Sequence, residues 1–356
     1  MEPAASDEVL IRREGRAGRI TLNRPKALNA LTYAMVKPIR AALAAWKDDP
    51  AVALVLLDGA GERGLCAGGD LRSLYEGRTQ GSGLARAFWR DEYRLNAFIG
   101  RYPKPYVALQ DGLVMGGGIG LSSHASHRIV TERSQLAMPE TGIGLIPDVG
   151  GTWLLANAPG ETGVYLGLTG EAMRAVDAIY ARFSDALVSS ARLPALIERL
   201  VDPGGGPVGE AIRGFAEHPG ESELARRREA IDAAFASPEI ERIHMALAGV
   251  PDEWAARARA GLGQKSPKAL KLTLAVIRQA RGLPSLEEAL KVEYRLTVRL
   301  FEDGEFPEGV RALLIDKDRK PKWSPPSLGE VMPELVARYL GALPLGEELT
   351  FEDQRT

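Results

Sequence analysis

Three short segments of the chain combine glycines and acidic residues with few other polar groups. They are residues 66–70 (CAGGD), 115–120 (MGGGIG) and 138–151 (MPETGIGLIPDVGG). The third segment holds two acids eight residues apart, Glu140 and Asp148, in an apolar stretch rich in turn-forming residues. Carboxyl groups in such surroundings are candidates for a raised pKa and for proton transfer. Asp148 could instead cap a helix that follows it, whereas Glu140 has no such alternative role.

The glycines of the first two segments would let a backbone N–H group approach a ligand, because no Cβ atom stands in the way. If Gly117 opens a helix, its N–H has no acceptor within that helix, and the helix dipole favours negative charge there. A second N–H, from Ala67 or a neighbour, would complete an oxyanion hole, in which each donor contributes about 3–4 kcal/mol. The alternative is that the glycines only allow a helix to pack closely on a strand.

Several other catalytic and binding motifs are missing. Residues 116–120 lack the third glycine of a dinucleotide fingerprint, and no GxSxG sequence indicates a serine hydrolase. His124 and His127 are the only histidines close together, without an acid nearby, so no metal site is predicted.

The elements that position these segments can be read from apolar runs and helical spacing. Buried strands are expected at residues 51–58 and 105–110, directly before the first two segments. Further strands are expected at 9–13, 19–23, 127–131 and 135–138, and helices at 32–47, 84–100, 150–157 and 162–168. This alternation predicts an α/β core. A glycine and proline cluster at 203–207 then divides a core at 1–203 from a C-terminal helical region at 204–356.

Composition narrows the choice of function class. The 356 residues carry a formal net charge of −2, which argues against broad binding of nucleic acid or anionic membranes. A single cysteine, Cys66, excludes an internal disulfide framework and fits a reducing compartment. The longest apolar runs are far shorter than a membrane helix, and residues 1–8 contain acids and no apolar run. We therefore predict a cytoplasmic protein without a membrane or nucleic-acid partner.

In order and spacing, the three segments resemble the crotonase (enoyl-CoA hydratase/isomerase) superfamily. Within it, the chain is most similar to the 3-hydroxyisobutyryl-CoA hydrolases. This narrower resemblance rests on residues 88–96, 104–108, 137–141, 264–267, 293–296, 308–311 and 314–318. The resemblance covers roughly residues 8–330 and is more specific than any single motif. It implies an α/β superhelix of repeated ββα units with a C-terminal helical region.

The resemblance also implies a role for individual residues. The oxyanion donors match the backbone N–H groups of Ala67 and Gly117. Hydratases carry one catalytic glutamate just after the glycine run and a second in the Pro-Glu segment. Here the first position is Gly120 and the second is Glu140. Because Gly120 has no side chain, addition of water to a double bond by two glutamates is not expected.

The hydrolase pattern expects Glu140 and Asp148 as catalytic residues, and both are present. The resemblance assigns substrate binding to Glu92, Gly68, Asp70 and Gly116. The implied reaction is hydrolysis of a short-chain β-hydroxyacyl-CoA thioester, above all 3-hydroxyisobutyryl-CoA in valine breakdown. Glu140 would attack the carbonyl or activate water, and the sequence leaves both mechanisms open. The alternatives are an enoyl-CoA hydratase or isomerase and a non-catalytic acyl-CoA binder.

The expected ligand is an acyl-CoA, with coenzyme A as part of the substrate and neither a separate cofactor nor a metal. Lys265, Lys268 and Lys271 are candidates for binding the CoA phosphates, although a solvated helix face would also explain them. The C-terminal helices are the expected contact region of a homo-oligomer, since the superfamily often forms trimers through them.

Overall fold

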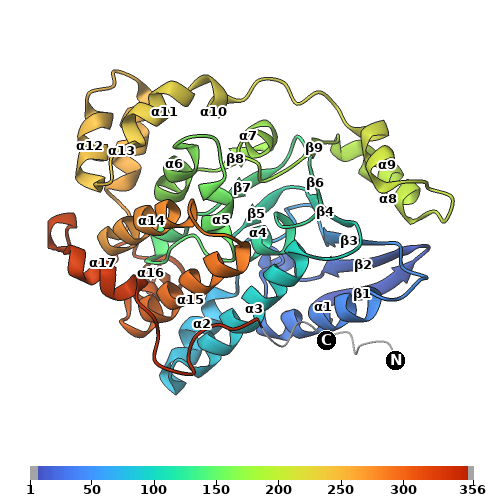
Figure 1. Cartoon of the computed structure of the whole chain (residues 1–356), viewed down its shortest axis with the longest axis horizontal. Coiled ribbons are helices and arrows are strands. Elements are labelled where there is room, and N and C mark those ends of the chain that lie inside the picture. Colours follow the sequence, from blue (N-terminus) through green and yellow to red (C-terminus); the bar gives the residue numbers. More distant parts are fainter. Residues whose placement is uncertain (1–6, 352–356) are drawn as a thin grey trace. The chain divides into compact units, whose positions relative to one another are not determined.

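The computed structural model describes residues 7–351, which form two compact units (Figure 1). The described residues of the first unit are 7–70, 94–137 and 172–222, and those of the second are 71–93, 138–171 and 223–351. The single boundary expected at residue 203 therefore differs from the observed division. Most of residues 1–8, on which the expected lack of a targeting segment rests, lies outside the described residues.

A six-stranded sheet forms the centre of the first unit, in the order β1-β2-β3-β4-β6-β9 (Figure 1). Its strands are β1 (Val9–Glu14), β2 (Ala17–Leu22), β3 (Leu54–Gly59), β4 (Tyr106–Gln110), β6 (His127–Val130) and β9 (Ala186–Leu187). The first two strands form an antiparallel hairpin, and every later pairing is parallel. All five residues of β4 are buried, as expected for a parallel strand covered on both faces.

A smaller sheet in the same unit contains β5 (Leu113–Met115), β7 (Gln135–Ala137) and β8 (Met173–Arg174). Strands β5 and β7 each follow a strand of the large sheet, so two strands recur before the next helix or turn. This is the expected repeated ββα pattern. The short strand β5 was not predicted, because its three residues merge into the glycine segment that follows.

Helices of the first unit are α1 (Tyr33–Trp46), α4 (Gly117–Ser122), α7 (Ala175–Tyr180), α8 (Leu193–Val201) and α9 (Val208–Phe215). One apolar cluster joins the large sheet to α8 and α9, through residues such as Leu56, Leu109, Leu196 and Ile212. This packing explains why the chain beyond residue 203 still belongs to the sheet-containing unit.

The second unit is mainly helical. It contains α2 (Leu71–Gly77), the first part of α3 (Gly83–Gly100), α5 (Gly151–Ala156), α6 (Thr162–Thr169), α10 (Glu223–Arg226), α11 (Arg228–Phe235), α12 (Ile240–Ala248), α13 (Glu253–Leu262), α14 (Pro267–Ala280), α15 (Leu286–Glu302), α16 (Glu305–Val310) and α17 (Pro333–Leu340). Helix α14 packs against α5 and α6, and its first turn is capped by the Ser266 side chain. Ser285 caps α15 in the same way.

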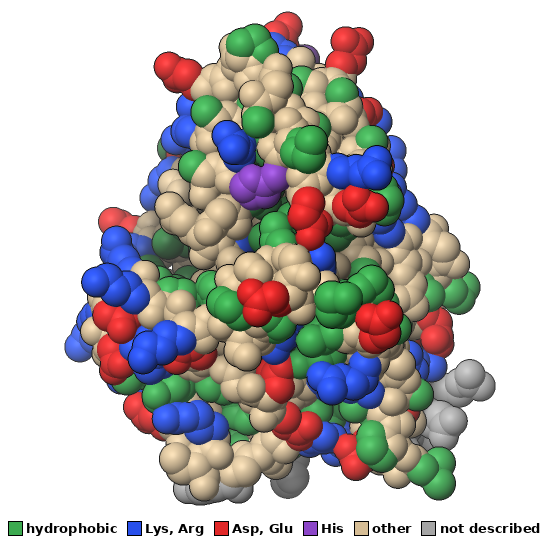
Figure 2. Space-filling view, turned by 90° about the vertical axis from the view of Figure 1, so that its left-hand side faces the viewer, with side chains coloured by type: hydrophobic (Ala, Val, Ile, Leu, Met, Phe, Trp, Pro, Cys, Tyr) green, Lys and Arg blue, Asp and Glu red, His purple; other side chains and the backbone are tan. Residues whose placement is uncertain are grey.

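The mixed charges on the surface agree with the nearly equal numbers of basic and acidic residues in the sequence. On the face shown in Figure 2, basic and acidic side chains are mixed with hydrophobic ones, and neither sign of charge dominates. Among residues 7–351, no helix combines the length and the apolar character needed to cross a membrane.

Candidate active site

Glu140 opens a short 3₁₀ helix, η3 (Glu140–Ile143), in the second unit. Gly144 ends η3 in a left-handed conformation with φ 71°, and its N–H donates to the Glu140 carbonyl oxygen. The Glu140 side chain is only 5% exposed, and its Oε2 atom has no hydrogen-bond partner among the described residues. Burial, and next the charge of Asp148, raise the pKa of this carboxyl well above its ordinary value. A buried oxygen that no protein group satisfies is available to a ligand.

Asp148 is equally buried, and its Oδ2 atom accepts a 2.7 Å hydrogen bond from the hydroxyl of Tyr93 on α3. The following helix, α5, has Gly150 as its N-cap residue and receives no side-chain cap from that position. The alternative in which Asp148 caps this helix is therefore wrong. Burial raises the pKa of Asp148 to about 6, and the hydrogen bond from Tyr93 opposes the shift.

Two more buried carboxyl groups of the second unit interact with Asp148. Glu92, on α3, is 2% exposed, and burial followed by the charge of Asp148 raises its pKa well above the ordinary value. Glu293, on α15, is fully buried, and burial raises its pKa to about 8. Neighbouring carboxylates disfavour each other's ionisation. We therefore expect the three carboxyl groups of Asp148, Glu92 and Glu293 together to retain at least one proton near neutral pH.

Lys265 lies beside the turn that carries Glu140. A Cβ atom added to Gly142 or to Gly170 would lie 3.4 Å from the Lys265 Nζ atom. The N–H of the next residue, Ser266, donates to the Thr141 carbonyl oxygen at 3.1 Å. The positive charge of Lys265 lowers the pKa of Glu140 and so opposes the effect of burial. Lys265 is thus the cation that favours the ionised form of Glu140.

The two other lysines proposed as phosphate ligands have partners inside the second unit. Lys268 Nζ lies 2.5 Å from Asp303 Oδ2 and 3.3 Å from Glu305 Oε2. Lys271 Nζ lies 2.8 Å from Glu241 Oε1. The alternative of a purely solvated helix face does not describe Lys268, which is buried. Both lysine side chains are therefore paired with carboxyl groups of the second unit, which does not favour them as ligands of the CoA phosphates.

The loop at residues 66–70 belongs to the first unit and is held on both sides. The N–H of Cys66 donates to the Leu113 carbonyl oxygen, and the N–H of Met115 donates to the Cys66 carbonyl oxygen. The N–H of Ala67 donates to the Leu28 carbonyl oxygen at 3.0 Å. This bond occupies the single hydrogen of that group, so the structure does not support Ala67 as an oxyanion donor.

The same loop offers two other backbone donors. The N–H groups of Gly68 and Gly69 donate to no acceptor among residues 7–351. Gly68 has φ 108°, a conformation that favours glycine. Asp70 Oδ2 lies 3.1 Å from Arg24 Nη2, which ties the end of the loop to the segment after β2. The assignment of Asp70 and Gly68 to substrate binding stays a prediction.

Gly117 is the first residue of α4, and Gly116 precedes it with φ 44°. The first bond of the helix runs from the Gly120 N–H to the Gly116 carbonyl oxygen at 3.1 Å, so the Gly117 N–H has no acceptor within the helix. Gly118 packs on the neighbouring loop, since a Cβ atom there would lie 2.5 Å from the Cys66 carbonyl oxygen. The glycine run therefore combines close packing with an N–H group that has no acceptor within the helix, and the role of Gly117 as an oxyanion donor stays a prediction.

We expect Gly118→Ala to lower the free energy of unfolding by about 1–3 kcal/mol, because the added methyl group would overlap the Cys66 carbonyl oxygen. Urea unfolding of the purified variants measures the change. Gly214→Ala in α9 is the matched control, because no atom lies within 4 Å of its added Cβ. The control should be neutral or stabilising by up to about 1 kcal/mol. Equal stability of the two variants would contradict the close approach.

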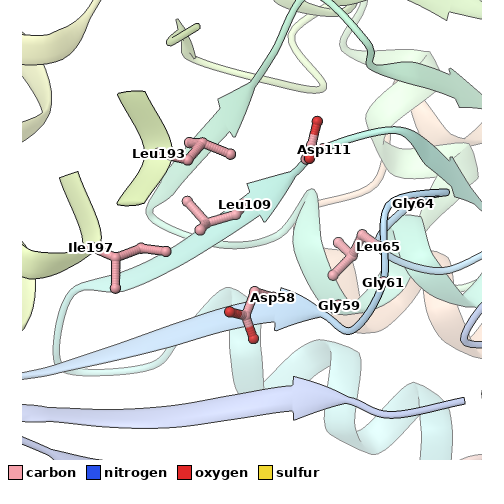
Figure 3. Close-up of a pocket in the computed structure, with 9 residues that line it drawn as sticks. All are labelled: Asp58, Gly59, Gly61, Gly64, Leu65, Leu109, Asp111, Leu193 and Ile197. Carbon is pink, nitrogen blue, oxygen red and sulfur yellow. The ribbon is translucent and has the colours of Figure 1, made fainter. Parts of the chain in front are cut away.

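A cavity of 150 Å³ lies in the first unit (Figure 3). Its walls come from β3, β4, the loop after β3 and α8, with the lining residues Asp58, Gly59, Gly61, Gly64, Leu65, Leu109, Asp111, Leu193 and Ile197. Both carboxylates are paired, Asp58 with Arg19 and Asp111 with Arg133. None of the predicted catalytic residues lines this cavity, so we do not assign it to the reaction.

The structure thus places Glu140 and Glu92 within reach of the charge of Asp148 in the second unit, and their catalytic and binding roles stay predictions. It adds Tyr93 and Glu293, which the sequence analysis missed although both lie in segments that carry the family resemblance. For Glu293, the signal that could have been used is its place on the apolar face of a predicted helix. Glu293 shares the buried face of α15 with Ala289 and Leu296, where an acidic residue needs a partner.

Comparison with known proteins gives the family. The enoyl-CoA hydratase/isomerase family model matches residues 17–340. A curated relative, the mitochondrial 3-hydroxyisobutyryl-CoA hydrolase of Danio rerio, is 41% identical over 351 residues, which is 96% of this chain and 92% of the relative.

Two solved structures are also similar over nearly their whole length. A carnitinyl-CoA dehydratase from Mycobacterium thermoresistibile is 44% identical with a TM-score of 0.93, covering 98% of this chain and 99% of that one. An enoyl-CoA hydratase from Rhodobacter sphaeroides 2.4.1 is 46% identical with a TM-score of 0.91, covering 97% and 100%. The predicted crotonase fold is confirmed, and the chain belongs to the enoyl-CoA hydratase/isomerase family.

Proposed function

We propose that this protein hydrolyses 3-hydroxyisobutyryl-CoA to 3-hydroxyisobutyrate and CoA, a step of valine breakdown. The observation that carries the proposal is the pair of buried carboxyls, Glu140 and Asp148, together with Gly120 at the position where a hydratase needs a second glutamate. The identity to a curated 3-hydroxyisobutyryl-CoA hydrolase over nearly the full chain supports the same substrate and reaction.

In this proposal, the thioester carbonyl oxygen accepts hydrogen bonds from the Gly117 N–H and from the N–H of Gly68 or Gly69. Such donors stabilise the negative charge that develops on the oxygen as the carbonyl carbon is attacked. Glu140 then either attacks the carbon to form a mixed anhydride, which water hydrolyses, or removes a proton from an attacking water. Both mechanisms need the ionised form of Glu140 and release CoA as the thiol.

Asp148 would orient the attacking water or the substrate hydroxyl, and Glu92 would bind that hydroxyl. The raised pKa of Glu92 suits this task, because a protonated carboxyl can donate a hydrogen bond as well as accept one. Gly116 gives the backbone before Gly117 the conformation that presents the donor.

Hydration or dehydration of an acyl-CoA is the second candidate, because the two similar solved structures carry those names. Gly120 argues against it, since one of the two acid–base groups is then missing. A non-catalytic acyl-CoA binder is a third candidate. The unsatisfied Oε2 atom of Glu140 argues against that one, because a protein that needs no catalysis gains nothing from a buried, unpaired carboxyl.

A panel of short acyl-CoA thioesters tests the substrate. Free thiol should appear faster from 3-hydroxyisobutyryl-CoA than from isobutyryl-CoA, because only the first offers a hydroxyl to Glu92 and Asp148. Isobutyryl-CoA is the matched control, since it differs by one oxygen atom. Equal rates would contradict the proposed hydroxyl recognition, and slow or absent release from both would contradict the thioesterase.

Lys265→Met should shift the acidic limb of the pH profile of kcat/KM to higher pH. The side chains that act on Glu140 are Asp148, Lys265 and Glu293, and among them only Lys265 favours the ionised carboxylate. Without this cation the pKa of Glu140 rises further, so activity is lost at a higher pH as the solution is acidified. Lys265→Arg, which keeps the charge, is the control and should leave the limb near its wild-type position. An unshifted limb in Lys265→Met would contradict this role.

We further propose that the protein works in the cytoplasm on a free acyl-CoA, without a separate cofactor or metal, and without a nucleic-acid or membrane partner. The curated relative from Danio rerio is named as mitochondrial, so fractionation of the source cells has to decide the compartment. The proposed homo-oligomer, with contacts through the C-terminal helices, is tested by light scattering of the purified protein.

A further inference from the structure

Glu293 makes its hydrogen bonds to the segment that carries Asp148. Its side chain reaches from α15 to the start of α5, where its Oε2 atom accepts a 2.7 Å bond from the Gly150 N–H. Its Oε1 atom accepts a 2.9 Å bond from the Thr152 N–H and a further bond from the Thr152 hydroxyl. Three donors from two residues thus converge on one carboxyl that is fully buried.

These bonds replace a cap that α5 lacks. The N-cap residue of α5 is Gly150, which has no side chain, and the Gly151 N–H donates to the Asp148 carbonyl oxygen at 2.6 Å, so the Thr152 N–H would be unsatisfied without Glu293. The carboxyl oxygens of Glu293 accept hydrogen bonds from the N–H groups of Gly150 and Thr152 and so satisfy them from another helix.

The turn between Asp148 and α5 needs such an anchor. Val149 has φ 54° and Gly150 has φ 80°, so two consecutive residues are left-handed. For a β-branched residue such as Val149 this conformation is unfavourable and persists only where the surroundings hold it. Glu293 holds the turn at Gly150, and the Tyr93 hydroxyl holds the side chain of Asp148.

We propose that Glu293 is a positioning residue, which fixes the turn at residues 148–150 so that the Asp148 carboxyl keeps its orientation toward Tyr93. This inference rests on the proposed thioester hydrolysis, in which Asp148 orients water or the substrate hydroxyl. Glu293 acts through Asp148 and does not itself contact the substrate.

Glu293→Gln is the first test. The glutamine can keep the acceptor for Thr152, but its amide group faces the Gly150 N–H, so two donors meet and the turn loses its anchor. We expect kcat for CoA release to fall about 10- to 100-fold, with KM within about threefold of wild type, because misplaced catalytic groups slow the chemical step. Glu288→Gln is the matched control on the same helix, since Glu288 bonds to Lys291 instead. The control should keep the wild-type kcat.

A double-mutant cycle separates positioning from a general effect on folding. If Glu293 acts through Asp148, Glu293→Gln should change kcat by less than about threefold in an Asp148→Asn background, because the group it positions is already lost. A merely structural role would lower kcat by the same factor in both backgrounds, and that result would overturn the proposal.

A milder variant covers the case in which Glu293→Gln does not fold. Thr152→Val removes one of the three donors and should lower kcat severalfold, again only when Asp148 is present. Unchanged kcat in Thr152→Val and in a folded Glu293→Gln would overturn the proposal. If the wild-type protein releases no CoA from 3-hydroxyisobutyryl-CoA, the proposed function fails; if it does and these variants match it, only the positioning role fails.

Discussion

Replacing Glu140 by glutamine should lower kcat for CoA release from 3-hydroxyisobutyryl-CoA by about 10²–10⁴. Glutamine has nearly the same size but neither attacks the thioester nor accepts a proton from water. Substrate binding should change little, because the amide fills the same buried space. The loss is measured by steady-state thiol release on the purified variant.

The stability of Glu140→Gln provides an internal check. The wild-type carboxyl is buried, with an Oε2 atom that has no partner among the described residues, and its pKa is raised by burial. Such a group is more stable in its neutral form, so a neutral glutamine should leave the melting temperature unchanged or raise it. Glu132→Gln, a replacement of an exposed carboxylate bonded to Ser190, is the control for kcat. Near-wild-type turnover in Glu140→Gln would contradict the assignment of Glu140.

Replacing Asp148 by asparagine should lower kcat by about 10²-fold, because the amide no longer orients the water or hydroxyl as a carboxylate does. Burial raises the pKa of Asp148 to about 6, so the wild-type pH profile should contain a step near that pH. Asp148→Asn should remove the step. Steady-state kinetics from about pH 4 to about pH 8 would measure both effects, since this range extends roughly two pH units on either side of the pKa.

Tyr93→Phe supplies the companion test for Asp148. The phenol donates to Asp148 at 2.7 Å and so lowers the pKa of that carboxyl. Without this donor the carboxylate is less favoured, and the step should move to higher pH. A step that stays in place in both variants would assign it to another group and contradict the role given to Asp148.

The segment that carries Glu140 and Asp148 could be singled out from the sequence because its signal is local. Glu140 and Asp148 stand out as acids among glycines, prolines and apolar residues, and burial of such acids follows from that setting. The strands before the two glycine segments could also be predicted from the sequence, because buried parallel strands are continuous apolar runs.

The partner of the Ala67 N–H could not be predicted. It donates to Leu28, a residue with φ 53° at the end of a short 3₁₀ helix, and no pattern around residue 67 indicates that contact. The domain boundary failed for a related reason. Helix α9 looks like part of the helical region, but its apolar residues pack on the sheet of the first unit.

The anchor of the Asp148 turn was missed because Glu293 is more than a hundred residues away in the chain. An acid on the buried face of a helix predicts a partner without identifying it. Tyr93 was missed in the same way, since tyrosine is also an ordinary core residue.

The most direct test of the proposed function follows two reactions on two substrates with the same enzyme preparation. CoA release is measured on 3-hydroxyisobutyryl-CoA, and loss of the conjugated double bond is measured on methacrylyl-CoA, its dehydrated counterpart. With Glu140 and Asp148 present and Gly120 in place of the second hydratase glutamate, we predict CoA release from the first and no hydration of the second. Hydration of methacrylyl-CoA without release of free CoA from either substrate would contradict the account.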